Sequence, residues 1–546
     1  MKNLTFIFCF LLAFSCGGPQ QEETSADTYD IVVYGGTSGG IAAAIQASRM
    51  GKTVALIEPY NRLGGMTTGG LGQTDIGNKQ AIGGISREFY RNIKAYYSQP
   101  ENWKWQEKEN YMDGGQTRTE EGEDAMWTFE PSSALQVYEE MLAAEDVVVV
   151  MGEKLDRDSG VLMEGSNIQQ ITTQSGRIFQ GKMFIDATYE GDLLATAGVD
   201  YTVGRESNDT YGETYNGVQL LEGHQFPDGV SPYVEPDNPS SGLLWGISTA
   251  SLAERGSGDN LVQAYNFRIC LTDNRDNMLP ISEPENYDTA RYELLARLFE
   301  AQPDMRGINQ YFIWSKMPNA KTDINNRGGF STDMINMSHA YPEASYEERE
   351  EIIKAHEDYT KGLLYFYATD PRVPEVLQEE VKRWGYPKDE YEANGNWSPQ
   401  LYVREARRMI GEYVMTQANC QGDEVVEDPI GLAAYTMDSH NCQRIVVDGQ
   451  VKNEGNVEVG GFPPYPISYK SITPKREQAT NLLVPVALSA SHIAFGSIRM
   501  EPVFMVLGQS AATAASMAID GETNVQEVDY AQLRERLLAD DQILEN

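Results

Sequence analysis

Residues Tyr29–Thr68 constrain the fold of this chain more than any other stretch. Ile31–Tyr34 is a short run rich in β-branched residues, as a buried parallel strand requires, and glycines and a small-residue helix from Ile41 follow it. A second strand is expected over Thr53–Ile57, and it leads into Glu58. Strand, glycine turn, helix, strand and acid follow one another as in a dinucleotide-binding βαβ unit.

The glycine turn departs from the G-x-G-x-x-G pattern at one position, where Thr37 replaces the second glycine. Its frame consists of Gly35, Gly36, Thr37, Ser38, Gly39 and Gly40. Glycines at such a turn let a pyrophosphate approach the backbone and the helix N-terminus, and an acid about twenty residues on, here Glu58, binds the ribose. An ordinary βαβ unit without a nucleotide is the alternative. The position near the N-terminus and the Gly64-Gly65 pair favour FAD over NAD.

Length and charge narrow the class of protein. A chain of 546 residues is long enough for two domains, and 41% hydrophobic and 23% charged residues are typical of a globular protein. The net charge of −38 disfavours nucleic acid and anionic membrane surfaces as partners, because both require an excess of Lys and Arg. The acidic balance says little about the substrate itself, which we expect to be a small molecule.

The first residues predict an export signal. Met1–Ser15 contains the apolar run Leu4–Phe14, which has the length of a signal core and is too short to span a bilayer. Cys16 follows and resembles a bacterial lipobox cysteine, although Ala13 stands in place of the usual leucine. The resemblance implies lipidation of Cys16, with residues 16–28 as lipidated cysteine and flexible tether. We expect an exported lipoprotein, in the periplasm or at the outer membrane or cell surface, that touches the membrane only through its lipid anchor. Plain secretion is the alternative.

Segments beyond the βαβ unit predict more strands. Val147–Val150 and Lys182–Ala187 have the composition of buried strands. Between them, Gly160–Gly165, Ile168–Thr173 and Arg177–Gln180 alternate in character and are separated by turn residues. These three segments predict a small antiparallel meander inserted into the nucleotide-binding fold.

The C-terminal part is predicted to return to the same domain. Asn481–Leu488 is an apolar strand candidate, and Glu501-Pro502 introduces a helix over Val503–Ala518, with proline at its preferred first turn. The N-terminus of such a helix carries partial positive charge that can face an anionic group. We expect an α/β fold: a Rossmann-like FAD-binding domain of residues 29–204 with 471–546, and an α+β substrate domain of residues 205–470.

Leu401–Gln417 is predicted to be a helix that groups Arg404, Arg407 and Arg408, with a solvated helix face as the alternative. Cys9 lies in the predicted export signal and Cys16 is the predicted lipidated residue, so three thiols remain in the folded chain: Cys270, Cys420 and Cys442. These three have no C-x-x-C spacing. They indicate neither a disulfide framework nor a zinc site. Buried thiols are expected, with a Cys420–Cys442 bond as the alternative.

Several motifs together resemble one family. They are VVYGGTSGGIAAA, IEPYNRLGGMTTGGLGQTD, FIDATYEGDLLATAG, YNFRICLT, INNRGGFSTD, LYVREARRM, MDSH and ASHIAFGSIRMEPVFMVLGQSAATAA. From Tyr29 to Ile519 the chain resembles the secreted bacterial FAD-dependent oxidoreductases, which belong to the glutathione-reductase-like flavoproteins. Some members carry the label "xanthan lyase", but no polysaccharide lyase motif is present, so lyase activity is a minor alternative.

The resemblance implies a set of FAD-binding residues. Gly35, Thr37, Ser38, Gly39 and Gly40 would surround the pyrophosphate, and Glu58 would hold the ribose. The full predicted set also includes Gly36, Arg62, Gly64, Gly65, Met66, Thr67, Asp186, Ala187, Met500, Glu501 and Val503. The last three begin the C-terminal helix, whose N-terminus would face the flavin's pyrimidine edge and stabilise anionic reduced flavin.

Four residues are candidates for catalysis. A base must remove a proton while the flavin takes a hydride, and His492 and His440 are the histidines best placed for that role. Arg404 and Arg499 are candidate clamps for an anion or hydroxyl groups. The alternatives are structural histidines and an Arg499–Glu501 salt bridge. The other histidines, His224, His339 and His356, are expected in surface or loop positions.

We therefore expect an FAD-dependent oxidoreductase of the bacterial envelope that transfers a hydride between flavin N5 and a small polar substrate, with a sugar or glycan fragment as the candidate. One alternative is a redox-neutral, flavin-dependent lyase or glycosidase-like enzyme. Another is a non-catalytic glycan-binding lipoprotein that retains FAD. No second complete G-x-G-x-x-G unit is present, so bound NAD(P)H is not expected.

Overall fold

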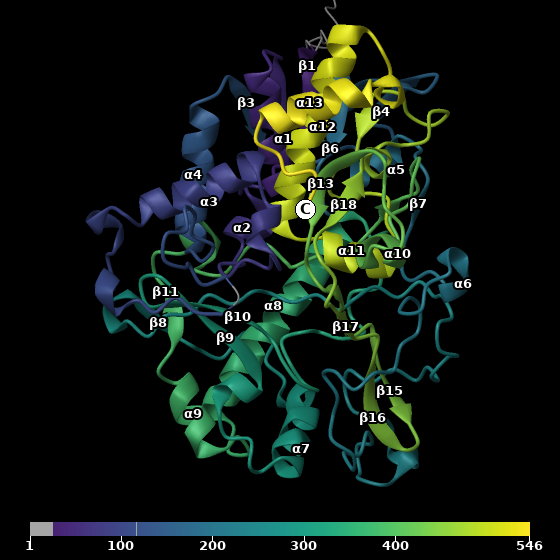
Figure 1. The fold of residues 1–546 in the computed structure, drawn as a ribbon. Helices are drawn as coiled ribbons and strands as arrows, with labels where there is room; N and C mark the ends of the chain where they lie inside the picture. The colour runs from purple at the N-terminus through teal and green to yellow at the C-terminus, as the bar shows by residue number, and fades with distance from the viewer. Residues whose placement is uncertain (1–25, 116) are drawn as a thin grey trace, which may run out of the picture.

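The computed structural model describes residues 26–115 and 117–546 (Figure 1). The predicted signal and the lipidated Cys16 lie outside the described residues, so export and lipidation stay predictions. The predicted tether extended to Thr28, but the first strand, β1 (Asp27–Tyr34), already begins at Asp27. Asp27 and Thr28 therefore belong to the sheet and not to the tether.

A mostly parallel sheet forms the upper half of the molecule in Figure 1 and confirms the α/β class. Its order begins β3 (Val147–Met151), β2 (Val54–Glu58), β1, β6 (Ile178–Asp186). These four strands are parallel, with Tyr34 opposite Ile57 on one side and Asp186 on the other. Their carboxyl ends lie at one edge of the sheet, where a ligand of an open α/β fold binds.

Strand β6 joins two segments that the sequence predicted to be separate. Its first half pairs antiparallel with β5 (Asn167–Thr172), which pairs with β4 (Val161–Glu164). Its second half pairs in parallel with β19 (Leu482–Leu483), so the predicted strand over Asn481–Leu488 is shortened to two residues. The meander is confirmed, but its third strand continues directly into the strand that ends at Asp186.

Two other predictions are wrong. β3 is a strand but not a buried one, because it is the last strand in the sheet order, and Val148 and Val149 are 43% and 37% exposed. Leu401–Gln417 forms no helix: it contains the two-residue β12 (Arg408–Met409), and α10 (Gln417–Gln421) starts where the helix was expected to end. Its arginines do not line a solvated face, because Arg404, Arg407 and Arg408 are buried and pair with Asp333, Asp192 and Glu206.

The helices of the upper half include two that the sequence predicted: the helix after the glycine turn begins at Ser38, and the C-terminal helix begins at Glu501, two residues before its expected start. The helices of this half are α1 (Ser38–Arg49), α2 (Gly65–Thr68), α3 (Gly84–Tyr96), α4 (Pro131–Ala143), α11 (His492–Ile498), α12 (Glu501–Gly521) and α13 (Tyr530–Ala539). Helix α12 is apolar and long enough to span a membrane by composition, but 89% of its most apolar window is buried in the protein. It crosses α1 so closely that a Cβ at Gly508 would lie 2.0 Å from the carbonyl oxygen of Gly39.

Much of the middle of the chain forms the lower half in Figure 1. The elements of the lower half include β8 (Met278–Pro280), α7 (Glu293–Ala301), β9 (Phe312–Met317), β10 (Lys321–Asn326), α8 (Tyr346–Thr369), α9 (Glu375–Val381), β11 (Gly385–Pro387), β15 (Gln443–Val447), β16 (Gln450–Glu454) and β17 (Val457–Val459). The labels of α5 (Asp192–Thr196), β7 (Tyr201–Thr202), β13 (Pro429–Ala433) and β18 (Tyr465–Ser468) lie in the upper half instead, and the middle of the chain also contains α6 (Asn208–Tyr211) and β14 (Met437–Ser439). The strands here pair two by two in small antiparallel sheets. Cys270, Cys420 and Cys442 are free and buried, so Cys420 and Cys442 are not bonded.

Candidate active site

The glycine turn lies at the carboxyl end of β1, against the end of β6. Gly35 has a φ of +104°, and a Cβ on it would lie 2.7 Å from the carbonyl carbon of Ala187. Only glycine fits this left-handed, closely approached position. The Gly36 N–H donates to Glu58 Oε2 at 2.8 Å, which ties the turn to the acid at the end of β2.

Thr37 explains the missing glycine of the motif. It is the N-cap of α1, where its Oγ1 accepts from the Gly40 N–H at 3.3 Å. The same hydroxyl donates to the Ala187 carbonyl at 2.7 Å. A threonine here therefore caps the helix and joins the turn to β6, which a glycine could not do.

Glu58 is held in one orientation at the edge of the sheet. Its Oε1 accepts from the Tyr60 N–H at 2.7 Å, while Oε2 accepts from Gly36. Burial raises the pKa of Glu58 to about 7. The sheet edge therefore presents a buried carboxylate that changes charge near neutral pH.

The start of α12 meets both glycine-rich tracts. Glu501 Oε2 accepts from Ser38 Oγ at 2.5 Å and from Thr67 Oγ1 at 3.0 Å, and Oε1 accepts from the Tyr189 hydroxyl at 2.7 Å. The Met66 N–H also donates to the Tyr189 oxygen, at 2.9 Å. Burial raises the pKa of Glu501. Residues from three distant segments are thus brought together.

Two predicted cofactor residues face local partners. Asp186 accepts from Thr188 and from the Leu194 N–H, so it holds the turn after β6. Arg62 donates to the carbonyl and hydroxyl of Thr68 at 3.1 and 3.2 Å.

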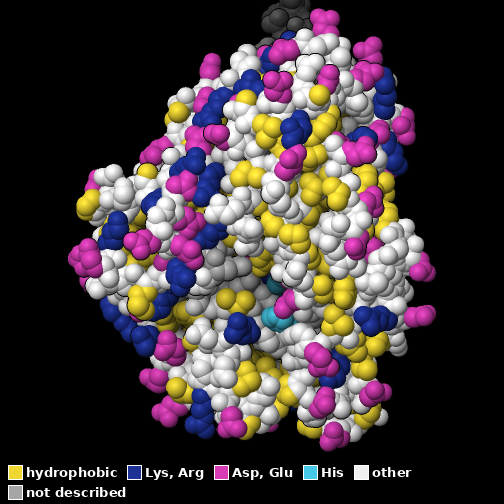
Figure 2. All heavy atoms as spheres, in the orientation of Figure 1, with side chains coloured by type: hydrophobic (Ala, Val, Ile, Leu, Met, Phe, Trp, Pro, Cys, Tyr) yellow, Lys and Arg dark blue, Asp and Glu magenta, His cyan; other side chains and the backbone are white. Residues whose placement is uncertain are grey.

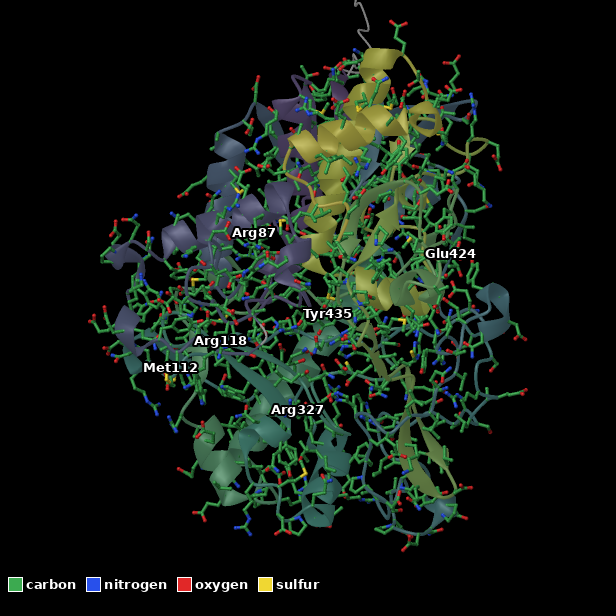
Figure 3. The ribbon with its side chains drawn as sticks, in the orientation of Figure 1. Arg87, Met112, Arg118, Arg327, Glu424 and Tyr435 are labelled. Carbon is green, nitrogen blue, oxygen red and sulfur yellow. The ribbon has the colours of Figure 1, made fainter. Side chains whose placement is uncertain are left out.

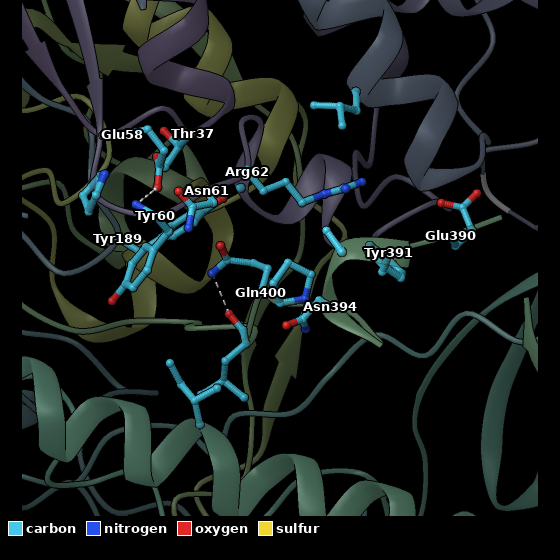
Figure 4. Close-up of a pocket in the computed structure, with 18 of the residues that line it drawn as sticks. Thr37, Glu58, Tyr60, Asn61, Arg62, Tyr189, Glu390, Tyr391, Asn394 and Gln400 are labelled. Carbon is cyan, nitrogen blue, oxygen red and sulfur yellow. Dashed lines mark hydrogen bonds between the residues drawn. The ribbon is translucent and has the colours of Figure 1, made fainter. Parts of the chain in front are cut away.

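A cavity of about 760 Å³ lies at the carboxyl edge of the sheet (Figure 4). It is lined by Gly35, Thr37, Glu58, Arg62 and Gly65, and also by residues 389–394 and 399–401 of the middle part. A nucleotide-sized space bounded by the glycine turn and by an acid at the next strand end fits the adenosine half of a dinucleotide.

A second group of buried polar side chains, the polar cluster, includes Arg499, which lies two residues before the start of α12. His440 Nδ1 lies 2.8 Å from Asp333 Oδ2, and its Nε2 lies 3.5 Å from Asp438 Oδ2. Arg404 Nη2 lies 3.0 Å from Asp333 Oδ1, and Arg499 Nη2 lies 3.3 Å from Asp438 Oδ2. Arg499 therefore pairs with Asp438 and not with Glu501. In Figure 2 histidine side chains lie in a hollow at the middle of the face shown.

The surroundings of the two aspartates in this cluster favour their ionised forms. Burial alone would raise the pKa of Asp333 and of Asp438. Arg404 and His440 outweigh burial at Asp333 and hold its pKa below the ordinary value. His440 and Arg499 do the same for the pKa of Asp438.

Some donors in the cluster lack acceptors. The Arg404 Nε, Arg499 Nε and Gln263 Nε2 atoms are buried and have no hydrogen-bond partner among the described residues. Buried donors are nearly always satisfied, so acceptor oxygens of a bound molecule would complete these donors. Tyr402, whose hydroxyl accepts from Arg499 Nη1 at 3.1 Å, is a further member. Sequence reasoning missed Gln263, Asp333 and Tyr402, although all three lie in or beside the motifs quoted for the resemblance.

His492 is in a different environment. Its Nδ1 lies 2.8 Å from Glu405 Oε2 and its Nε2 lies 2.9 Å from Ser439 Oγ, so both ring nitrogens are paired. His356 is not at the surface as predicted: it lies on α8, is 1% exposed, and burial lowers its pKa to about 4. Tyr435, near the centre of Figure 3, receives a hydrogen bond at its carbonyl from Ser497 of α11.

Comparisons with known proteins bear on the family of this chain. A family model described as FAD dependent oxidoreductase matches residues 30–537. No curated protein matches this sequence. Similar solved structures include T. acidophilum thioredoxin reductase, at 15% identity over 29% of this chain and 34% of that chain, with a TM-score of 0.16. A second is P. horikoshii L-proline dehydrogenase, at 15% identity over 34% of this chain and 59% of that chain, with a TM-score of 0.23. A third is Proteus vulgaris L-amino acid deaminase, at 15% identity over 38% of this chain and 56% of that chain, with a TM-score of 0.23. The chain thus spans about a third of the length of thioredoxin reductase, and under two thirds of the other two.

Proposed function

Because this chain belongs to the family of FAD dependent oxidoreductases, with FAD as its cofactor, we propose that it moves a hydride between N5 of FAD and a small polar substrate bound by the polar cluster. The cavity at the sheet edge, the glycine turn and Glu58 would hold the adenosine half of FAD. The N-terminus of α12 would lie at the other half and stabilise negative charge there.

The observation that carries the proposal is the group of unpartnered buried donors, Arg404 Nε, Arg499 Nε and Gln263 Nε2. Planar guanidinium groups bind carboxylates or neighbouring hydroxyl oxygens, so a substrate with several oxygens, such as a sugar or a glycan fragment, suits the cluster. Its buried acids and bases favour a polar substrate over an apolar one, because buried charged groups need polar partners.

His440 is the proton acceptor in this proposal. The 2.8 Å contact between His440 Nδ1 and Asp333 assigns the ring proton to Nδ1, which donates to the carboxylate. Among the described residues, the nearest polar partner of Nε2 is Asp438, at 3.5 Å. Asp333 orients the ring and stabilises the imidazolium that forms when Nε2 takes a proton. His492, with both nitrogens paired, instead holds Ser439 and Glu405 in place.

Anaerobic spectroscopy tests the proposal. The purified protein should be yellow, and its flavin absorption should bleach when the right sugar or hydroxy acid is added without oxygen. The control is the Arg404→Met/Arg499→Met double variant, which should stay yellow and fail to bleach. Protein without releasable FAD, or equal bleaching of the double variant, would contradict the proposal.

FAD affinity should depend on pH through Glu58. Its pKa is about 7 without the cofactor, so below that pH it holds a proton. A ribose hydroxyl that donates to the carboxylate favours the ionised form, so FAD binding releases this proton. By linkage, the affinity should rise by up to about tenfold per pH unit below pH 7 and level off above it. FAD titrations across this range check the slope, which Glu58→Gln should flatten; a pH-independent wild type would refute this role.

A further inference from the structure

One wall of the FAD cavity comes from a part of the chain far from the glycine motif. Residues 389–401 follow β11, and most of them line the same space as Thr37 and Glu58. Figure 4 shows Asn394 and Gln400 of this segment around one cavity with Glu58 and Arg62. We propose that residues 389–401 bind the adenosine half of FAD. This inference rests on the FAD site proposed above.

Buried ion pairs fix the beginning of the segment. The Lys321 side chain is fully buried, and its Nζ lies 2.7 Å from Glu390 Oε1, 3.0 Å from Asp389 Oδ1 and 2.7 Å from Glu130 Oε1. Glu390 also accepts from the N–H and Oγ of Ser132, at 3.0 and 2.7 Å. Ser132 lies in the first turn of α4, which lines the cavity too. Buried charges keep such partners because leaving one unpaired is costly.

Further contacts hold the rest of the segment against the glycine tracts. Ser398 Oγ donates to the Gly69 carbonyl at 2.6 Å. Tyr391 is buried with a φ of +53°, and the Arg62 guanidinium lies 4.9 Å from the centre of its ring. A non-glycine residue keeps this left-handed conformation only where its surroundings determine it. The segment is therefore preformed.

Two amides of the segment offer acceptors for a nucleoside. Gln400 Nε2 donates to the Leu401 carbonyl at 2.9 Å, and Asn394 Nδ2 donates to the Trp397 carbonyl at 3.0 Å. Their side-chain oxygens receive no hydrogen bond from the described part of the chain. The amino group of adenine and the ribose hydroxyls are donors, so they complement these oxygens.

The test compares FAD, ADP and FMN binding by the full-length protein after its flavin is removed. The Asn394→Ala/Gln400→Ala variant should bind FAD and ADP about tenfold more weakly, because two hydrogen bonds to adenosine are lost. FMN lacks adenosine, so its affinity should not change. Lys388→Ala is the matched control, since Lys388 is exposed and does not line the cavity.

The outcomes separate the two proposals. FAD affinity within twofold of wild type in the double variant, with a loss in Glu58→Gln, would exclude the segment and leave the FAD site in place. Unchanged FAD affinity in both the double variant and Glu58→Gln would overturn the placement of adenosine against residues 389–401 and also the FAD site at Glu58. An equal loss of FMN affinity would show a general effect on the fold and would also overturn the inference. Asn394 is exposed and Gln400 half-buried, so each single variant should fold, and thermal unfolding checks this.

Discussion

Replacing His440 with alanine should lower kcat/KM by about 10²- to 10⁴-fold while FAD stays bound, because a positioned general base contributes this much. The ring lies 2.8 Å from Asp333 and 3.5 Å from Asp438, the two carboxylates that also pair with Arg404 and Arg499. It does not line the FAD cavity, so the flavin content should not change. Steady-state kinetics with a substrate that bleaches the flavin measures the loss.

A further readout distinguishes proton transfer from packing. Added imidazole should restore part of the activity of His440→Ala. His492→Ala is the matched control: it removes contacts to Glu405 and Ser439, so it should lower thermal stability more than the rate of the chemical step. Normal turnover of His440→Ala, with His492→Ala inactive and FAD-bound, would assign the base to His492.

Gly508→Ala should lower the free energy of unfolding by about 3 kcal/mol, at the upper end of overpacking costs. The added Cβ would lie 2.0 Å from the Gly39 carbonyl oxygen, and backbone atoms of α1 cannot move aside as a flexible side chain can. Separating α12 from α1 also moves Glu501 from Ser38, so FAD affinity should fall as well. Denaturant unfolding and FAD titration measure the two effects.

The matched control lies in the same helix. A Cβ at Gly521 would meet only the Thr523 side chain at 3.6 Å, an ordinary contact. Gly521→Ala should therefore be neutral or stabilising by up to about 1 kcal/mol, since alanine is the better helix former. A similar loss of unfolding free energy in both variants would mean that the close contact of Gly508 with Gly39 is not the cause of the destabilisation.

Local patterns predicted the parts of the fold that neighbouring residues determine. The βαβ unit has its own hydrophobic and glycine pattern, and α12 has a proline in its first turn. The helix predicted over Leu401–Gln417 does not form, because its arginines pair with acids that lie far away in the sequence. Arg408 pairs with Glu206, and Arg407 pairs with Asp192. Pairing with β1 also joins the predicted segments Arg177–Gln180 and Lys182–Ala187 into the single strand β6.

The candidate site was predicted in pieces. His440, Arg404 and Arg499 are single residues with suitable chemistry, and the structure places them within one cluster. Their partners could not be predicted, because Asp333 lies 107 positions from His440 and no short motif joins them. The role of Thr37 was equally hidden, since its hydrogen-bond acceptor belongs to Ala187.

The position of α12 has a consequence for how the protein is made. The βαβ unit is synthesised several hundred residues before α12, but α1 packs against that helix. β6 likewise pairs with β19, which is synthesised much later. Such long-range pairings slow folding. The nucleotide-binding half should therefore stay incomplete until α12 has been synthesised, and cofactor loading should follow that step.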